Sequence, residues 1–185
     1  MTTNEILHKA AEAVSSLQMM SDDTVSAILR EVASSLRAAV DSILEANAKD
    51  LARMSPDNPK YDRLKLTPAR IDGIASDMEN VAGLPSPLGR VISEQVRPNG
   101  MTIRKVSVPF GVIGVIYEAR PNVTADVFSL CFRSGNVCVL KGGSDADDSS
   151  RAIVSVIHHA IPRLWHSSMK ILSCSGVPYA LSNAK

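Results

Sequence analysis

Apolar residues recur every three or four positions from the start of the chain to about Val81, which is the period of amphipathic helices. The spacing predicts one helix over residues 4–18. A second, longer helix should begin after Ser21, a favoured cap that two aspartates follow, and its apolar stripe continues to Leu44. We expect this long helix to break near Ala46.

Turn residues divide the rest of the helical region. A short helix should end near Met54, before the loop 55–60, whose prolines, asparagine and aspartate favour turns. Thr67 is a favoured cap and Pro68 is a favoured first residue of a helix, so another helix is predicted from there to about Val81.

Residues 90–108 change to a pattern rich in β-branched residues. Two such runs flank Pro98, Asn99 and Gly100, and an Asn-Gly pair accepts the positive φ of a tight turn, so the stretch predicts a β-hairpin. The alternation of apolar and polar residues is imperfect, which indicates two partly exposed faces. The hairpin is either a ribbon that binds another subunit or a local antiparallel flap, and the pattern favours neither.

Two short apolar runs follow, with a helical period between them. The first, 110–117, is too short for an ordinary helix and predicts a strand that is buried on both faces. Pro121 ends this strand, and the next residues predict a helix with Asn122 as its cap and Gly135 just past its end. Residues 137–140 predict a second buried strand.

The loop 141–144 then leads into a helix that starts with several aspartates and continues to about Ala160. Strand, helix, strand and helix in this order predict a parallel sheet with a right-handed crossover. The predicted fold class is therefore α/β, with N-terminal helices, a β-hairpin and then a Rossmann-like parallel βαβα unit.

Composition narrows the possible functions. The chain has 185 residues and a net charge of +1, with no basic block of the kind that indicates nucleic-acid binding. No apolar run reaches the ~20 residues of a membrane helix, and the first residues show no secretory signal. The three cysteines, Cys131, Cys138 and Cys174, lack the CxxC spacing of metal sites. We interpret them as reduced thiols of a cytoplasmic protein and predict no metal.

Polar residues follow both predicted strands, at the edge of the sheet where proteins of this class bind ligands. Lys141 could act as a point charge, while Gly142 and Gly143 would let a cofactor phosphate approach the helix that starts near Ser144. The loop matches neither GxGxxG nor the Walker motif, and an ordinary turn with a solvated lysine explains it as well. The amide of Asn122 either caps its helix or donates to a developing oxyanion.

Three further residues are weaker candidates for a site. Glu118 and Arg120 end the first strand, and they either pair with each other or contact a substrate. Cys174 has no identifiable base near it in the sequence, so we interpret it as an ordinary cysteine.

The composition changes after Ile161. Pro162 should end the preceding helix, and residues 162–185 contain none of the 19 acidic residues of the chain. We therefore divide the chain into an incomplete cofactor-binding unit over 1–161 and an atypical tail over 162–185. The tail is either disordered or forms one further strand over 170–173.

Several segments resemble the γ-glutamyl phosphate reductases, also called glutamate-5-semialdehyde dehydrogenases, of the aldehyde dehydrogenase superfamily. They are ILEANAKDL, GRVISEQVRPNGM, VPFGVIGVIYEARPNVTADV and SGNVCVLKGGS. The resemblance covers about residues 1–160 and is specific to this branch. A generic aldehyde dehydrogenase would have a Pro-Trp-Asn-type motif where Arg120, Pro121 and Asn122 stand.

The resemblance implies a cytoplasmic enzyme of proline biosynthesis that reduces L-glutamyl 5-phosphate with NADPH and releases phosphate and glutamate 5-semialdehyde. In the family a cysteine thiolate attacks the acyl phosphate, and hydride from NADPH reduces the resulting thioester. Asn122 is similar in motif position to the asparagine that stabilises the oxyanion. Lys141 is similar to the lysine that contacts the adenosine ribose of the cofactor, and Gly142, Gly143 and Ser144 belong to the same loop.

Family members are much longer, and their nucleophilic cysteine lies in a second α/β domain. We therefore expect that cysteine to be missing here and the chain alone to be inactive. A truncated or frameshifted gene product is the first explanation, and an N-terminal fragment is the second. The alternative function is a non-catalytic chain that binds a nucleotide, or that binds an intact subunit through the hairpin 90–108 in a homo-oligomer.

Overall fold

The computed structural model describes residues 2–118 and 120–165. Its helices are α1 (Thr3–Gln18), α2 (Asp22–Ala38), α3 (Val40–Leu51), α4 (Tyr61–Leu64), α5 (Pro68–Gly83), α6 (Pro121–Arg133) and α7 (Asp147–Trp165), with a 3-10 turn η1 (Ser144–Ala146) before α7. Its strands are β1 (Val91–Val96), β2 (Thr102–Val106), β3 (Val112–Ile116) and β4 (Val137–Lys141). The predictions for 170–173 and Cys174 lie outside the described residues.

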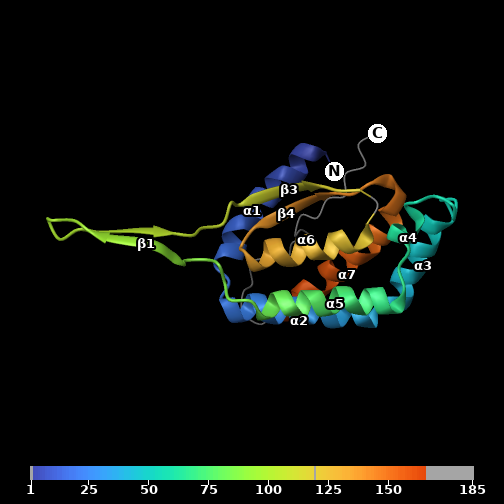
Figure 1. Cartoon of the computed structure of the whole chain (residues 1–185), viewed down its shortest axis with the longest axis horizontal. Coiled ribbons are helices and arrows are strands. Elements are labelled where there is room, and N and C mark those ends of the chain that lie inside the picture. The colour runs from blue at the N-terminus through green and yellow to red at the C-terminus, as the bar shows by residue number, and fades with distance from the viewer. Residues whose placement is uncertain (1, 119, 166–185) are drawn as a thin grey trace.

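The body of the molecule is layered. Figure 1 shows β3 and β4 along one side, α6 beneath them, and α2 and α5 side by side on the opposite side. The core lies between these elements, and its fully buried side chains come mainly from α2, α5, α6 and α7. They include Ile28, Leu29, Leu36, Ile71, Met78, Phe128, Ile153 and Ile157.

The helices begin where the caps predict. The Ser21 side chain accepts from the amide of Thr24 at the start of α2. In the same way, the Thr67 side chain accepts from the amide of Arg70 at the start of α5, whose first residue is Pro68. The predicted break near Ala46 is wrong, because the chain turns at Ala39, between α2 and α3. α2 packs on both α5 and α7, and α3 packs mainly on α7, so the apolar stripe continues through the turn and does not show where it lies.

The hairpin is confirmed. β1 and β2 pair antiparallel, and both strands are exposed along their whole length. Figure 1 shows the hairpin projecting away from the body. At its tip the amide of Arg97 donates to the carbonyl of Met101 at 2.9 Å, and Gly100 has a φ of 81°. Gly100 therefore supplies the left-handed conformation, and Asn99 does not share it.

The parallel βαβα unit is also confirmed, because β3 pairs parallel with β4 from Val112 opposite Val137 to Ile116 opposite Lys141. The prediction that β3 is buried on both faces is wrong. Ile113 and Val115 pack toward α6, but Ile116 on the other face is 86% exposed. The described sheet that holds β3 has two strands, and α1 lies mainly against β4, so no element among residues 2–118 and 120–165 covers one face of β3.

The end of α7 departs from the prediction as well. Pro162 was expected to end the helix, but α7 continues to Trp165. A proline inside a helix removes one backbone hydrogen bond yet has a φ close to the helical value, so a final turn can still form around it. Among the helices of the described residues, none has the length and apolar character that a membrane span needs.

Candidate functional site

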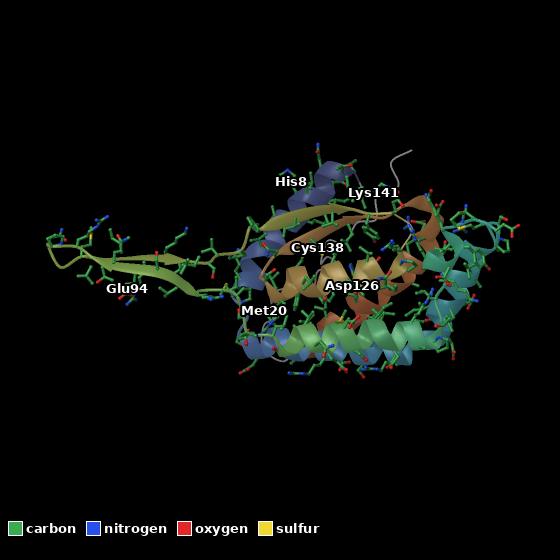
Figure 2. The ribbon with its side chains drawn as sticks, in the orientation of Figure 1. His8, Met20, Glu94, Asp126, Cys138 and Lys141 are labelled. Carbon is green, nitrogen blue, oxygen red and sulfur yellow. The ribbon has the colours of Figure 1, made fainter. Side chains whose placement is uncertain are left out.

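The candidate site begins at the carboxyl ends of β3 and β4, which lie side by side. The amide of Tyr117 donates to the carbonyl of Lys141 at 3.1 Å and so extends the parallel pairing by one bond. The half-buried Lys141 donates through Nζ to the carbonyl of Gly142 at 3.0 Å. Figure 2 shows Lys141 at the end of the sheet that is remote from the hairpin. This placement agrees with the sheet edge that the sequence predicts.

Gly142 has a structural reason to be a glycine. A Cβ atom there would lie 3.3 Å from the Tyr117 hydroxyl, so the ring of Tyr117 packs directly over the backbone of the loop. That hydroxyl forms a 2.7 Å hydrogen bond with Thr124 of α6, and burial raises the pKa of Tyr117. β3, α6 and the loop 141–144 are therefore joined at one point. Gly143 is half-buried and Ser144 is exposed, so the loop is open to solvent beyond Tyr117.

The start of α7 differs from the expectation. The sequence predicted free amides there for a cofactor phosphate, but the carboxylate of Asp50 on α3 accepts from the amides of Asp148 and Ser149 at 3.2 and 2.8 Å. The expectation of free amides is therefore wrong for Asp148 and Ser149, because an internal carboxylate already accepts from both.

Asn122 is not the cap of α6, and that prediction is wrong. Arg120 takes the cap position in an extended conformation, and Pro121 is the first helical residue. Proline favours that position because its fixed φ suits a helix and its missing N–H is not needed there. Asn122 lies inside the first turn, where its Nδ2 donates to the Asp126 carboxylate at 3.3 Å.

Asp126 shares a partly buried environment with Asn122. Burial raises the pKa of Asp126, and Asp77 on α5 raises it further, whereas the bond from Asn122 opposes the rise. Figure 2 shows Asp126 on α6 and Lys141 at the end of the sheet. Within the described part of the chain, no hydrogen bond joins Asn122 to Lys141. The two candidate residues therefore belong to separate polar groups.

The charged residues and the cysteines that the sequence singled out do not form a common site in the described structure. Glu118 and Arg120 are exposed, and neither takes part in an ion pair with another described residue. Cys131 and Cys138 are buried between α6 and β4 as reduced thiols, and a hydrogen bond from Cys138 lowers the pKa of Cys131. Among residues 2–118 and 120–165, no cluster of three potential metal ligands occurs.

Sequence reasoning missed Asp50, Tyr117, Thr124 and Asp126. The sequence does contain a sign that Asp50 is buried, because Ile43, Asn47 and Asp50 share one face of a helix. Two polar residues in line with a buried isoleucine indicate buried polar partners. The spacing does not identify those partners, and Ser149, which contacts both Asn47 and Asp50, is about a hundred residues away along the chain.

Comparison with known proteins decides the relationship. No family model matches the chain. The γ-glutamyl phosphate reductase of Parabacteroides distasonis is 63% identical over 163 residues, which are 88% of this chain and 39% of that protein. The corresponding protein of Bacteroides thetaiotaomicron is 62% identical over 165 residues.

This chain matches the N-terminal portion of the γ-glutamyl phosphate reductases. It spans about two fifths of the length of the curated relatives that it matches. The crystal structure of the γ-glutamyl phosphate reductase from Thermotoga maritima is 38% identical, with a TM-score of 0.82 over 86% of this chain and 39% of that one.

Further solved structures agree with this family fold. The γ-glutamyl phosphate reductase from Saccharomyces cerevisiae is 28% identical, with a TM-score of 0.87 over 98% of this chain and 46% of that one. A NAD-dependent benzaldehyde dehydrogenase from Corynebacterium glutamicum is 21% identical, with a TM-score of 0.64 over 82% of this chain and 31% of that one, which shows the fold only. The fold is thus part of the aldehyde dehydrogenase fold.

Proposed function

We propose that this chain is the cofactor-side, N-terminal part of an NADPH-dependent reductase that converts L-glutamyl 5-phosphate to L-glutamate 5-semialdehyde and phosphate in proline biosynthesis. A cytoplasmic location goes with that role. The observation that carries the proposal is the 63% identity to a γ-glutamyl phosphate reductase over 163 residues that include the loop 141–144. In the complete enzyme the cofactor supplies hydride, and the residues described above hold it and help to stabilise charge.

The loop 141–144 fits the adenosine end of a nicotinamide cofactor. Lys141 lies at the carboxyl end of a parallel strand, and its ammonium donates to a carbonyl of the same loop, from which it can turn toward ribose hydroxyls. Gly143 carries no side chain that would keep a ligand away, whereas the ring of Tyr117 fills the space beside Gly142, which can contact a ligand only through its other backbone atoms. Ser144 is exposed and adds a hydroxyl beside them.

Asn122 is proposed as the oxyanion donor. An asparagine amide has two N–H bonds, and in this chain one of them donates to Asp126 at 3.3 Å. The other can donate to an oxyanion, while the bond to Asp126 fixes the direction of the amide. The nucleophilic thiolate is proposed to belong to neither described cysteine, since Cys131 and Cys138 are both buried in the core.

Two substitutions in a complete enzyme that carries this segment test the proposal. Lys141→Ala should raise the KM for NADPH roughly 10- to 100-fold with kcat nearly unchanged, because it removes one charge-assisted hydrogen bond to a part of the cofactor that does not react. Asn122→Ala should lower kcat about 100-fold or more. Lys60→Ala, which removes an exposed lysine of the loop 55–60, is the matched control and should change neither constant.

The outcomes are easy to tell apart. An unaltered NADPH KM in Lys141→Ala would mean that the loop is only a turn. A normal kcat in Asn122→Ala would remove this residue from catalysis. The chain alone should show no reductase activity, which an assay of the purified chain with NADPH consumption as readout will check.

The exposed hairpin of β1 and β2 suggests a second function, which is binding to another subunit. Its strands expose apolar side chains on both faces, and exposed groups of this kind often mark protein interfaces. We propose that β1 and β2 bind a second copy of the enzyme. Light scattering of Ile92→Lys and Ile103→Lys should show a smaller assembly than the parent, whereas Ser93→Lys, a control on the same ribbon, should keep the parent mass. An unchanged mass in all three variants would reject this role.

A further inference from the structure

Asp50 is a fully buried acidic residue on α3, with a relative exposure of 0%. Aspartates are almost never buried in this way unless their charge is compensated. Asp50 belongs to the ILEANAKDL segment, to which the proposed reaction gives no role. Its environment therefore needs an explanation of its own.

The carboxylate of Asp50 has partners on three sides. Oδ1 accepts from the amide of Asp148 at 3.2 Å, and Oδ2 accepts from the amide of Ser149 at 2.8 Å and from the Ser149 hydroxyl. Arg53, two residues after the end of α3, donates to Oδ1 and also pairs with the Asp148 carboxylate at 2.7 Å. Asn47 donates to the same Ser149 hydroxyl at 3.0 Å. α3 thus binds the first turn of α7 through one connected set of polar groups.

This arrangement determines where an anion can bind. The first amides of a helix attract anions because their N–H groups have no partner within the helix. At the start of α7 the Asp50 carboxylate is that anion, and it is already buried. A phosphate of the cofactor would have to displace a bound charge to reach these amides. The atoms of the loop 141–144, and not the first amides of α7, are therefore available to contact the cofactor.

The loop 141–144 is then held at both ends. At its beginning, Lys141 pairs with β3, and the ring of Tyr117 lies over Gly142. At its end, η1 leads directly into the residues that Asp50 holds. Residues from β3 and from α3 fix the two ends, although α3 lies almost a hundred residues earlier in the chain.

We infer that Asp50 is a positioning residue for cofactor binding. It holds the start of α7, and thereby the end of the loop 141–144, so that Lys141 reaches the ribose of NADPH. The inference rests on the proposed function, since it assumes that this loop contacts the cofactor. Asp50 itself does not touch the cofactor. Its role is to hold the start of α7 in place and to keep anions away from it.

The test uses Asp50→Asn in a complete enzyme that carries this segment. The amide keeps the shape of the carboxylate but loses its charge, and its NH2 group faces a backbone N–H instead of accepting from it. We expect the Kd and the KM for NADPH to rise about 10-fold, with kcat within a factor of two of the parent. In this chain, without cofactor, hydrogen exchange of the peptide that covers 141–150 should become faster.

Ser21→Ala is the matched control. It removes the cap of α2, where the Ser21 hydroxyl accepts from the amide of Thr24 at 3.2 Å, and so weakens a helix start that is remote from the loop. The control should lower the melting temperature but leave NADPH binding and the exchange of 141–150 unaltered. Ser149→Ala, which removes one donor to Asp50 and keeps the charge, should raise the KM about threefold. If Asp50→Asn does not fold, the result for Ser149→Ala decides the test.

Lys141→Ala, measured in parallel, separates the two proposals. If Lys141→Ala weakens NADPH binding and neither Asp50→Asn nor Ser149→Ala does, the loop 141–144 contacts the cofactor, but the positioning role of Asp50 is overturned. If Lys141→Ala leaves binding unaltered, the loop does not contact the cofactor, and both proposals fail. A rise in KM that Ser21→Ala reproduces would also overturn the inference, because general loss of stability would then explain it.

Discussion

Asn47→Ala is the substitution whose effect the structure defines best. The Asn47 side chain is buried and makes three hydrogen bonds. It donates to the carbonyl of Leu64 at 2.9 Å and to the Ser149 hydroxyl at 3.0 Å, and it accepts from the amide of Leu66 at 2.8 Å. One side chain therefore joins α3 to the end of α4, to the segment that follows α4, and to α7.

The cost of the substitution follows from the groups that it leaves without a partner. The carbonyl of Leu64 and the amide of Leu66 are backbone groups of buried residues, and each loses its bond to Asn47. A buried polar group without a partner costs about 1–3 kcal/mol, so the two groups together cost about 2–6 kcal/mol. The Ser149 hydroxyl still donates to Asp50 and adds little. This loss is a large part of the about 5–15 kcal/mol by which domains are usually stable.

Urea unfolding of this chain, followed by circular dichroism at a helical wavelength, measures the effect. With a slope of about 2 kcal/mol per molar urea, the midpoint should fall by about 1–3 M with the slope unchanged. Asn58→Ala is the control, because the exposed Asn58 accepts from the amide of Lys60 at 2.9 Å and water can replace it, so the loss should stay near 0.5 kcal/mol. A loss for Asn47→Ala no larger than that of the control would refute the reasoning.

Three further substitutions test other parts of the fold. Gly135→Ala should destabilise the chain by about 1–3 kcal/mol in urea, because Gly135 has a φ of 70° and an added Cβ would lie 2.8 Å from Leu88. Tyr117→Phe removes the 2.7 Å bond to Thr124 and should lower the melting temperature by an amount that corresponds to about 1 kcal/mol. Burial lowers the pKa of His158, so the unfolded state binds the proton more readily, and stability should fall as the pH drops through 6.5. His158→Gln should flatten that slope in urea midpoints measured from pH 7.5 to about 5.5.

Much of the fold could be predicted because its signals are local. Ser21 and the pair Thr67 and Pro68 mark helix starts with a known mechanism, and the structure shows both caps in use. The change from a helical period to β-branched runs around Pro98 locates the hairpin, and the two short apolar runs locate β3 and β4. Each of these signals lies within about ten residues of the element that it predicts.

The errors have a common physical origin in contacts between distant parts of the chain. The exposure of Ile116 depends on which elements cover β3, and its sequence does not contain that information. The turn at Ala39 lies inside a continuous apolar stripe, because α2 and α3 both pack against α7, which lies more than a hundred residues further along the chain. The start of α7 appeared open because Asp147 and Asp148 suit any helix start, whereas the carboxylate that occupies it comes from α3.

The two halves of the proposed site are held by different means, and this matters for how they act. Asn122 is oriented by Asp126 one turn along the same helix, so its geometry is set within α6. Lys141 is oriented from outside its own strand, by β3 and Tyr117 on one side and by the α3–α7 connection on the other. Since no described hydrogen bond joins the two groups, a change in one need not disturb the other. Cofactor affinity and oxyanion stabilisation should therefore respond to separate sets of substitutions, with the KM for NADPH reporting on the first and kcat on the second.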